Sequence, residues 1–168
     1  CKEERQQLSS IQAVCVGVIT IDTIALVDKY PGEDERVLAE EISRAGGGPA
    51  AVAAVALSRL GVKSAIVGTI GDDADGKEVL RIFAQEGVDT SGISIGTTPT
   101  AGSVIVSSKE HSARAISTRQ PVVQAPINDA AKKLMASTQW LHVDHVGIKR
   151  LDEMGIARGK GPQISFDA

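Results

Sequence analysis

Residues 45–61 read AGGGPAAVAAVALSRLG, and this stretch organises the rest of the chain. Pro49 suits the first position of a helix, where its fixed φ is helical and its missing N–H would have no partner. Gly61 suits the C-terminal end of that helix, where a positive φ is usual. Glycines let backbone N–H groups approach a ligand closely, and the helix N-terminus behind them offers unpaired donors. The stretch therefore predicts a ligand-binding turn that opens a closely packed helix.

The composition limits the class of protein. The chain has 168 residues, of which 42% are hydrophobic and 23% charged, which is typical of a globular domain with a sizeable core. A net charge of -3 and only 2% aromatic residues argue against a nucleic-acid partner. No apolar run reaches about 18 residues, so we expect no membrane partner. Cys1 and Cys15 are not expected to pair, which favours a reducing, cytoplasmic location.

The order of apolar runs and helical patterns predicts the fold class. Alternation of strands and helices favours an α/β domain with a mainly parallel sheet and helices on both sides. The predicted core strands are 13–19, 65–70, 140–146 and 163–167. The predicted helices are 49–60, 77–86, 129–136 and 148–158. Residues 88–95 are interpreted as a connection with a possible short strand, residues 1–12 as a flexible arm, and residues 13–168 as one partial domain.

Two excursions from this alternation contain short extended pieces instead of helices. They cover about residues 23–44 and 101–118, and we expect them to form a small separate sheet. Asp22 comes just before the first excursion and just after the first core strand. Ligands of open α/β sheets bind beyond the carboxyl ends of strands, so Asp22 is a candidate ligand contact, with a turn-capping role as the alternative.

Helical spacing also predicts how the central helix packs. Val52, Val55, Ala56 and Leu60 fall on one face, which we interpret as the face turned toward the core.

Two other glycine patterns resemble nucleotide-binding loops only superficially. Residues 71–78, GDDADGKE, nearly fit a phosphate loop, but Glu78 replaces the hydroxyl that should meet Mg²⁺, and three aspartates would repel phosphates. A turn with an acidic helix cap is the simpler interpretation. Residues 46–51 imitate a dinucleotide fingerprint, but no apolar strand leads directly into them.

A family resemblance fits the chain better. Residues 46–61 resemble the N-terminal signature of the ribokinase-like (PfkB-type) carbohydrate kinases. Residues 16–22, VGVITID, are similar to that family's first strand and sugar-binding aspartate, and residues 67–76, VGTIGDDADG, to its G-x-[IV]-G-D-D-x-x-G segment. The two excursions fall where the family has a β-sheet lid. The resemblance covers about residues 13–168.

The resemblance implies a three-layer α/β/α core with a β lid over a sugar site. It implies transfer of the γ-phosphoryl group of ATP, with Mg²⁺, to a sugar hydroxyl, and a homodimer through the lid. The substrate-binding positions that it implies are Asp22, Gly46, Gly47, Gly48, Val52 and Asp144.

The sequence departs from the family pattern at two points. Val52 stands where the family usually has an asparagine that contacts a sugar hydroxyl. The substrate therefore stays open among neutral, phosphorylated and sulfonated sugars. The catalytic segment D-T-x-G-A-G-D does not occur in these 168 residues. We expect this chain to be the sugar-binding half, inactive alone, with the catalytic residues and most ATP contacts in a C-terminal half. A nucleoside kinase and a non-catalytic sugar-binding or interaction module are the alternatives.

Several polar residues remain to be placed. His142, Asp144 and His145 suggest a metal site, but alternation along a strand brings only two of them to one face, so no metal is predicted. Asp144 or His145 could instead contact sugar. Arg114 and Arg119 lie in or beside the second excursion, where they could meet an anionic group on the sugar or remain solvated.

Overall fold

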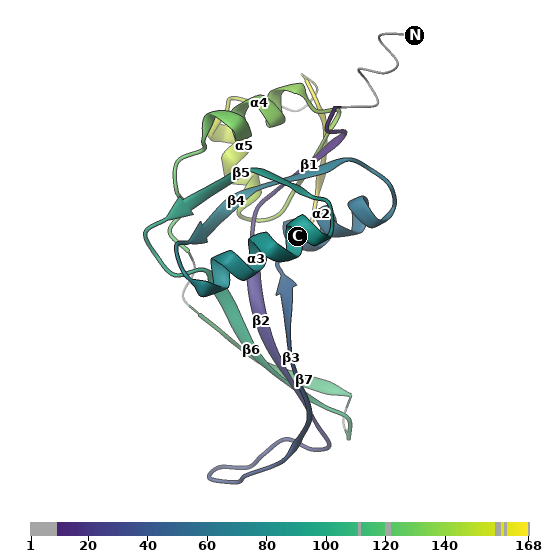
Figure 1. The fold of residues 1–168 in the computed structure, drawn as a ribbon, viewed down its shortest axis with the longest axis vertical. Coiled ribbons are helices and arrows are strands. Elements are labelled where there is room, and N and C mark those ends of the chain that lie inside the picture. Colours follow the sequence, from purple (N-terminus) through teal and green to yellow (C-terminus); the bar gives the residue numbers. More distant parts are fainter. Residues whose placement is uncertain (1–9, 111, 120–121, 157–158, 160, 168) are drawn as a thin grey trace.

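The computed structural model describes residues 10–110, 112–119, 122–156, 159 and 161–167, which form two sheets and the helices that cover one of them (Figure 1). The larger sheet has five strands in the order β5-β4-β1-β8-β9, and the smaller has four in the order β3-β2-β6-β7. The core strands are β1 (Ala13–Val16), β4 (Ser64–Gly71), β5 (Asp89–Gly96), β8 (Trp140–Val143) and β9 (Gln163–Phe166). The strands of the smaller sheet are β2 (Thr20–Val27), β3 (Ala39–Gly47), β6 (Ala101–Ser108) and β7 (Ala113–Thr118). The helices are α2 (Pro49–Arg59), α3 (Ala74–Gln85), α4 (Asp129–Ser137) and α5 (Gly147–Glu153).

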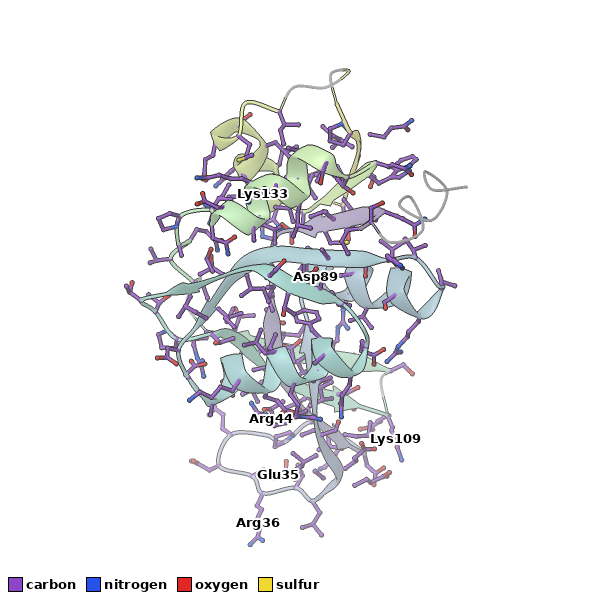
Figure 2. The ribbon with its side chains drawn as sticks, turned by 45° about the horizontal axis from the view of Figure 1, so that its top comes forward. Glu35, Arg36, Arg44, Asp89, Lys109 and Lys133 are labelled. Carbon is purple, nitrogen blue, oxygen red and sulfur yellow. The ribbon has the colours of Figure 1, made fainter. Side chains whose placement is uncertain are left out.

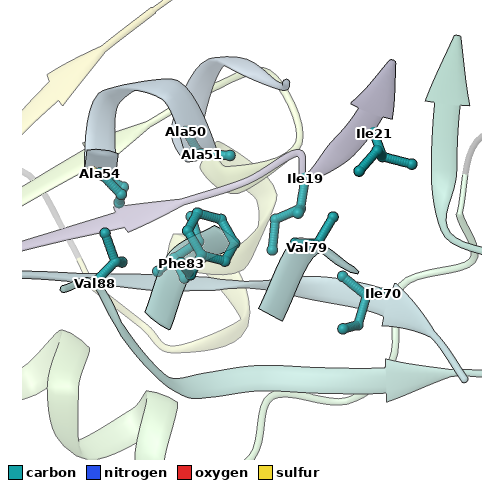
Figure 3. Packing of buried hydrophobic residues seen from close by; sticks show 11 residues of the cluster. Ile19, Ile21, Ala50, Ala51, Ala54, Ile70, Val79, Phe83 and Val88 are labelled. Atoms are coloured by element: carbon teal, nitrogen blue, oxygen red, sulfur yellow. The ribbon is translucent and has the colours of Figure 1, made fainter. Parts of the chain in front are cut away.

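The core sheet is parallel throughout and apolar on both faces. Alternate residues of β1 point to opposite faces, so Cys15 joins one buried cluster while Val14 and Val16 join another. Helices α2 and α3 complete the first cluster, where Phe83 and Val79 of α3 lie beside the alanines of α2 (Figure 3). Helices α4 and α5 complete the second cluster. This is the predicted α/β arrangement with helices on both sides.

The smaller sheet, called the lid below, consists of β2, β3, β6 and β7 and extends away from the core as a long blade (Figure 1). β2 pairs with β3 in antiparallel fashion and with β6 in parallel, and β6 and β7 form a hairpin. The lid includes Thr20 and Gly47, so the first excursion is longer than the predicted 23–44. The second excursion occupies Ala101–Thr118.

The structure differs from the predicted elements at three points. The first core strand ends at Val16, and Asp22 lies inside the lid strand β2 instead of after the core strand. β8 ends at Val143, so Asp144 and His145 lie outside the strand and do not follow its alternation. The connection with a possible short strand at residues 88–95 is the full edge strand β5, because pairing with one neighbour suffices for a strand of mixed polarity.

Helix α2 turns a different face to the core than its spacing predicted. The buried residues are Ala50, Ala51 and Ala54, whereas Val52 is 55% exposed and Leu60 is 81% exposed. Small side chains let the helix lie close against the sheet. The larger Val55 and Leu57 pack against the same cluster from its edge and are only partly buried. The helix ends were predicted correctly, with Pro49 in the first turn and Gly61, at φ 85°, just after the last turn.

The remaining expectations concern the chain ends and membranes. The predicted arm, residues 1–12, falls mostly on residues 1–9, which lie outside the described part of the chain. Within the described part, no helix is both long and apolar enough to cross a membrane.

Candidate functional site

The glycine stretch joins the lid to the core, and two of its glycines cannot carry a side chain. A Cβ on Gly47 would lie 2.3 Å from Asp22 Oδ2 and 2.5 Å from Thr20 Oγ1. Gly48 has φ +96°, and its Cβ would lie 2.3 Å from the carbonyl oxygen of Val18. Gly46 differs, because a Cβ there would meet only Ile82 at 3.9 Å, an ordinary contact. The close approach of chain segments thus requires glycine at Gly47 and Gly48 but not at Gly46.

Asp22 lies directly against Gly47 at the base of the lid. Its Oδ2 is 3.5 Å from the Thr20 hydroxyl, at the limit of a hydrogen bond. Its Oδ1 is buried and has no hydrogen-bond partner among the described residues. A buried carboxylate oxygen without a donor is costly, so this oxygen is suited to accept a hydrogen bond from a ligand.

The N-terminus of α2 begins immediately after these glycines. Its N-cap, Gly48, supplies no side-chain hydrogen bond, and the first turn has no acidic residue. Helix termini leave backbone N–H donors without intrahelical partners, so these donors face solvent or a ligand. Val52 lies one turn further on and lines a largely apolar cavity of about 390 Å³ between α2 and α3, which Thr20, Gly46 and Gly47 also line.

Asp144 lies nearby, and its carboxylate accepts hydrogen bonds from backbone N–H groups. The residue is fully buried at 0% exposure. Its Oδ2 accepts a hydrogen bond from the N–H of Val18 at 2.7 Å, and its Oδ1 accepts from the N–H groups of Val146 and Gly147 at 2.9 Å. These bonds tie the segment after β1 to the start of α5. The geometry thus places Asp144 as a positioning residue and does not support the predicted direct sugar contact.

The G-D-D segment also has a structural role. Asp73 caps α3, with Oδ1 accepting from the Gly76 N–H and from the Thr100 hydroxyl, and Oδ2 from the Thr100 N–H. Burial raises the pKa of Asp73, but these hydrogen bonds and the nearby Arg119 outweigh burial and lower it. The acidic cap, and not a phosphate loop, explains this stretch.

A second cavity, of about 600 Å³, lies between the base of the lid, the ends of β1 and β4, and α5. Thr20, Gly102 and Ser103 line its lid side, and Lys149 and Arg150 line its α5 side. Its further polar lining residues are Thr69, Thr118, Arg119, Gln124, His145 and Glu153. The sequence drew attention to Arg119 and His145 but gave no signal for Lys149 and Arg150, because segments far apart in the sequence form this cavity.

The other candidates do not join this site. Arg114 is exposed on β7 and lines neither cavity. His142 contacts the Ser165 hydroxyl across β8 and β9, at 2.9 Å, away from both cavities. In the described ranges, no group of three or more His, Cys, Asp or Glu side chains is arranged to hold a metal ion.

Comparison with known proteins assigns the family. Residues 10–153 match the model of the pfkB family of carbohydrate kinases. The chain belongs to this family. Mouse ketohexokinase is 33% identical over 141 residues, which are 79% of this chain and 45% of that protein. The pfkB family assignment confirms the resemblance seen in the sequence.

Solved structures agree on the fold of this pfkB domain. A provisionally assigned ribokinase from Agrobacterium tumefaciens superimposes with a TM-score of 0.80 at 26% identity, covering 95% of this chain and 53% of that one. Ribokinase from Arabidopsis thaliana, solved with ribose and ATP, gives a TM-score of 0.70 at 18% identity over 95% of this chain and 54% of that one. The pfkB chain described here thus spans about half the length of the relatives that it matches.

Proposed function

We propose that this chain is the sugar-binding half of an ATP-dependent carbohydrate kinase. The observation that carries the proposal is Asp22, whose buried Oδ1 has no partner within the described residues and which lies against Gly47 at the base of the lid. Hydrogen bonds from hydroxyls to a carboxylate are charge-assisted and contribute about 1.5–3 kcal/mol each. Asp22 would accept such bonds from the hydroxyls of a sugar bound between the lid and α2.

The neighbouring residues have distinct roles in this proposal. Gly47 leaves room for the Asp22 carboxylate, and the first turn of α2 offers N–H donors to the sugar or its phosphorylated product. Val52 cannot form the hydrogen bond that an asparagine would form, so it favours a substrate with an apolar or differently oriented group at that point. Asp144 acts indirectly, by holding Val18 and the start of α5 in place.

ATP and Mg²⁺ belong to the proposed reaction of the longer protein. ATP supplies the phosphoryl group, and Mg²⁺ neutralises its developing charge. The described residues contain no cluster that fits Mg²⁺. We propose a cytoplasmic location, since the described cysteine, Cys15, is free and buried.

The test is a kinase assay of the full-length protein with neutral sugars, sugar phosphates, sulfonated sugars and nucleosides, followed by ADP release. We expect turnover with at least one sugar, and we expect Asp22→Asn to raise the KM for that sugar at least about tenfold, which equals about 1.4 kcal/mol. Asp152→Asn, a charge-matched change on the exposed side of α5, is the control and leaves KM unchanged. Turnover with nucleosides alone, or an unaltered KM in the Asp22→Asn protein, would overturn the proposal.

We further propose that the lid pairs with the lid of a second copy. Ile42 and Val104 are 71% and 56% exposed. Ile42 pairs with Ala25 of β2, and Val104 pairs with Thr23 of β2. Ala25 and Thr23 are two residues apart and point to the same side, so Ile42 and Val104 share one face of the lid. Exposed apolar side chains on a sheet favour association. Sedimentation equilibrium of the wild type should give a dimer, and Ile42→Glu should shift it to monomer; a monomeric wild type contradicts the proposal.

A further inference from the structure

The 600 Å³ cavity beside the lid is positively charged, although the chain as a whole carries a net charge of -3. Arg119, Lys149 and Arg150 line it together with His145, and Glu153 is the one carboxylate among the described lining residues. That carboxylate is already engaged, because its Oε2 accepts a hydrogen bond from Arg150 Nη1 at 2.8 Å. The lining therefore has an excess of positive charge.

Two of these cations are held in fixed positions. Arg150 is only 7% exposed, and its Nη2 donates to the carbonyl oxygen of Ala125 at 2.6 Å and to Gln124 Oε1 at 3.2 Å. Arg119 Nη1 donates to the carbonyl oxygen of Thr100 at 2.6 Å. Burying a guanidinium is costly unless its donors are satisfied, and the contacts of Arg150 satisfy several of them. Arg119 is more exposed and also lies 3.5 Å from Asp75 Oδ2, so Arg150 is the preorganised cation of the cavity and Arg119 is a second one anchored at the lid base.

Lys149 differs from these arginines because its ammonium group is uncommitted. It forms no ion pair with any residue in the described ranges, and it lines the cavity next to Arg150. A lysine ammonium is a compact charge on a flexible stem, which suits it to meet an anion that arrives with a ligand. Lys149 and Arg119 are therefore the residues best placed to respond to a bound anion.

The cavity adjoins the proposed sugar site, although Asp22 itself does not line it. Thr20 lines it, and the Thr20 hydroxyl lies next to the Asp22 carboxylate. Ser103, another lining residue, pairs with Asp22 across β2 and β6, so the two side chains share one face of the lid. A ligand whose hydroxyls reach Asp22 would thus extend its remaining groups toward Lys149 and Arg119. The volume is within the range of small-molecule sites.

We propose that this cavity binds the anionic group of a sugar that already carries one, such as a phosphate, sulfonate or carboxylate. The substrate of the proposed kinase is then an acidic sugar and not a neutral one. The inference rests on the proposed function, because it assumes that Asp22 binds the sugar part of the same ligand. Cations that surround an anion in a partly enclosed site contribute both affinity and selection against neutral analogues.

The test is calorimetric titration of the full-length protein with four probes: fructose, fructose 6-phosphate, inorganic phosphate and ADP. We expect fructose 6-phosphate to bind at least about tenfold more tightly than fructose. We expect Lys149→Gln and Arg119→Gln each to remove most of that advantage while leaving the affinity for fructose unchanged. Lys133→Gln is the control, because Lys133 is exposed on α4, at the end of the molecule opposite the lid (Figure 2), and it leaves both affinities unchanged.

The outcomes separate this inference from the proposed function. Asp22-dependent binding of fructose with no gain from the 6-phosphate overturns the inference and leaves the proposed function intact. Tight, Lys149-dependent binding of ADP or inorganic phosphate, equal to that of fructose 6-phosphate and independent of Asp22, assigns the cavity to another phosphate source and also overturns it. Failure of every probe to bind contradicts both.

Discussion

The core sheet and the lid belong to one chain but differ in how far their strands are buried. Every residue of β4 is buried, whereas every residue of β7 is exposed. The core strands are parallel, and the central strands β1 and β4 are buried along their whole length and largely apolar. The lid has no covering helix along most of its length, and its strands mix polar and apolar residues. We therefore expect the core to determine stability and the lid, together with its base, to determine what the protein binds.

The largest expected effect is on the free energy of unfolding, and it is measured by replacing one isoleucine in each sheet. Ile66 in β4 is fully buried, and Ile116 in β7 is 48% exposed. Ile66→Ala leaves a cavity and should lower the free energy of unfolding by about 2–5 kcal/mol. Ile116→Ala should lower it by less than about 1 kcal/mol, because little apolar area is buried there. Urea denaturation measures both values, and similar losses would show that the lid is as much a part of the folded core as β4.

The next effect concerns the junction between the sheets, where Asp73 caps α3 and binds Thr100 at the start of the lid hairpin. Asp73→Ala removes the cap and leaves the Thr100 N–H without its acceptor, which should cost about 1–3 kcal/mol. Asp72→Ala is the matched control, because Asp72 is exposed in the same turn.

Asp73 should also make the free energy of unfolding depend on pH, in a direction set by its lowered pKa. Hydrogen bonds lower the pKa of folded Asp73 against the opposing effect of burial. A carboxyl group whose pKa is lowered on folding stabilises the protein above its unfolded pKa of about 4, and this contribution is lost as the pH falls through the folded pKa. The difference in unfolding free energy between the wild type and Asp73→Ala should therefore be largest near pH 7 and shrink below about pH 4. A difference that grows on acidification would contradict the assignment.

Glycines at the lid base should affect binding more than stability. In Gly47→Ala the new methyl group would clash with the Asp22 carboxylate, whereas in Gly46→Ala it meets only the end of a flexible isoleucine. We expect Gly47→Ala to weaken sugar binding at least about tenfold, or about 1.4 kcal/mol, and Gly46→Ala to change it by less than about twofold. Equal effects of the two substitutions in calorimetric titration would show that the Asp22 position is not the determinant.

The smallest effect tests the ion pairs that connect the lid to α3. Asp75 in α3 contacts both Arg44 of β3 and Arg119, which follows β7. These pairs are partly exposed, and exposed pairs contribute about 0–1 kcal/mol. Asp75→Asn should hardly change the unfolding free energy, but it should speed amide hydrogen exchange in β3 and β7. Unaltered exchange would show that backbone pairing alone holds the lid in place.

The core strands were easier to predict from the sequence than other parts of the fold. The strands around Cys15, Ile66 and Leu141 were predictable because continuous apolar runs indicate strands buried on both faces. The edge strand β5 was indicated only as a possible short strand, since Asp89, Thr90 and Ser91 give it no apolar pattern. The face of α2 was predicted wrongly, because hydrophobicity alone ranks valine and leucine above alanine as core residues.

The site was predictable where it depends on backbone shape. The glycine stretch and Asp22 come together as residues of one local strand pair, and the sequence indicated both. Asp144 was expected to contact sugar, and this contact stays a prediction; the sequence did not indicate that its carboxylate accepts backbone hydrogen bonds after the end of β8. Most of the cationic cavity could not be predicted from the sequence, because Lys149 and Arg150 approach Arg119 only through the packing of α5 beside the lid.

The way the lid is joined to the core has a mechanical consequence. Only residues 17–19 separate β1 from β2, and Gly48 alone separates β3 from α2, so the lid is joined to the core by short connections at this end. β2 rises about 3.3 Å per residue, which places Asp22 about 7 Å from Thr20 and Val27 about 23 Å from it. In a rigid rotation about Thr20, the displacement of each residue of β2 would grow with its distance from Thr20. A rotation that displaced Val27 by about 5 Å would displace Asp22 by only about 1.5 Å, so the carboxylate is placed where the position of the lid would affect it least.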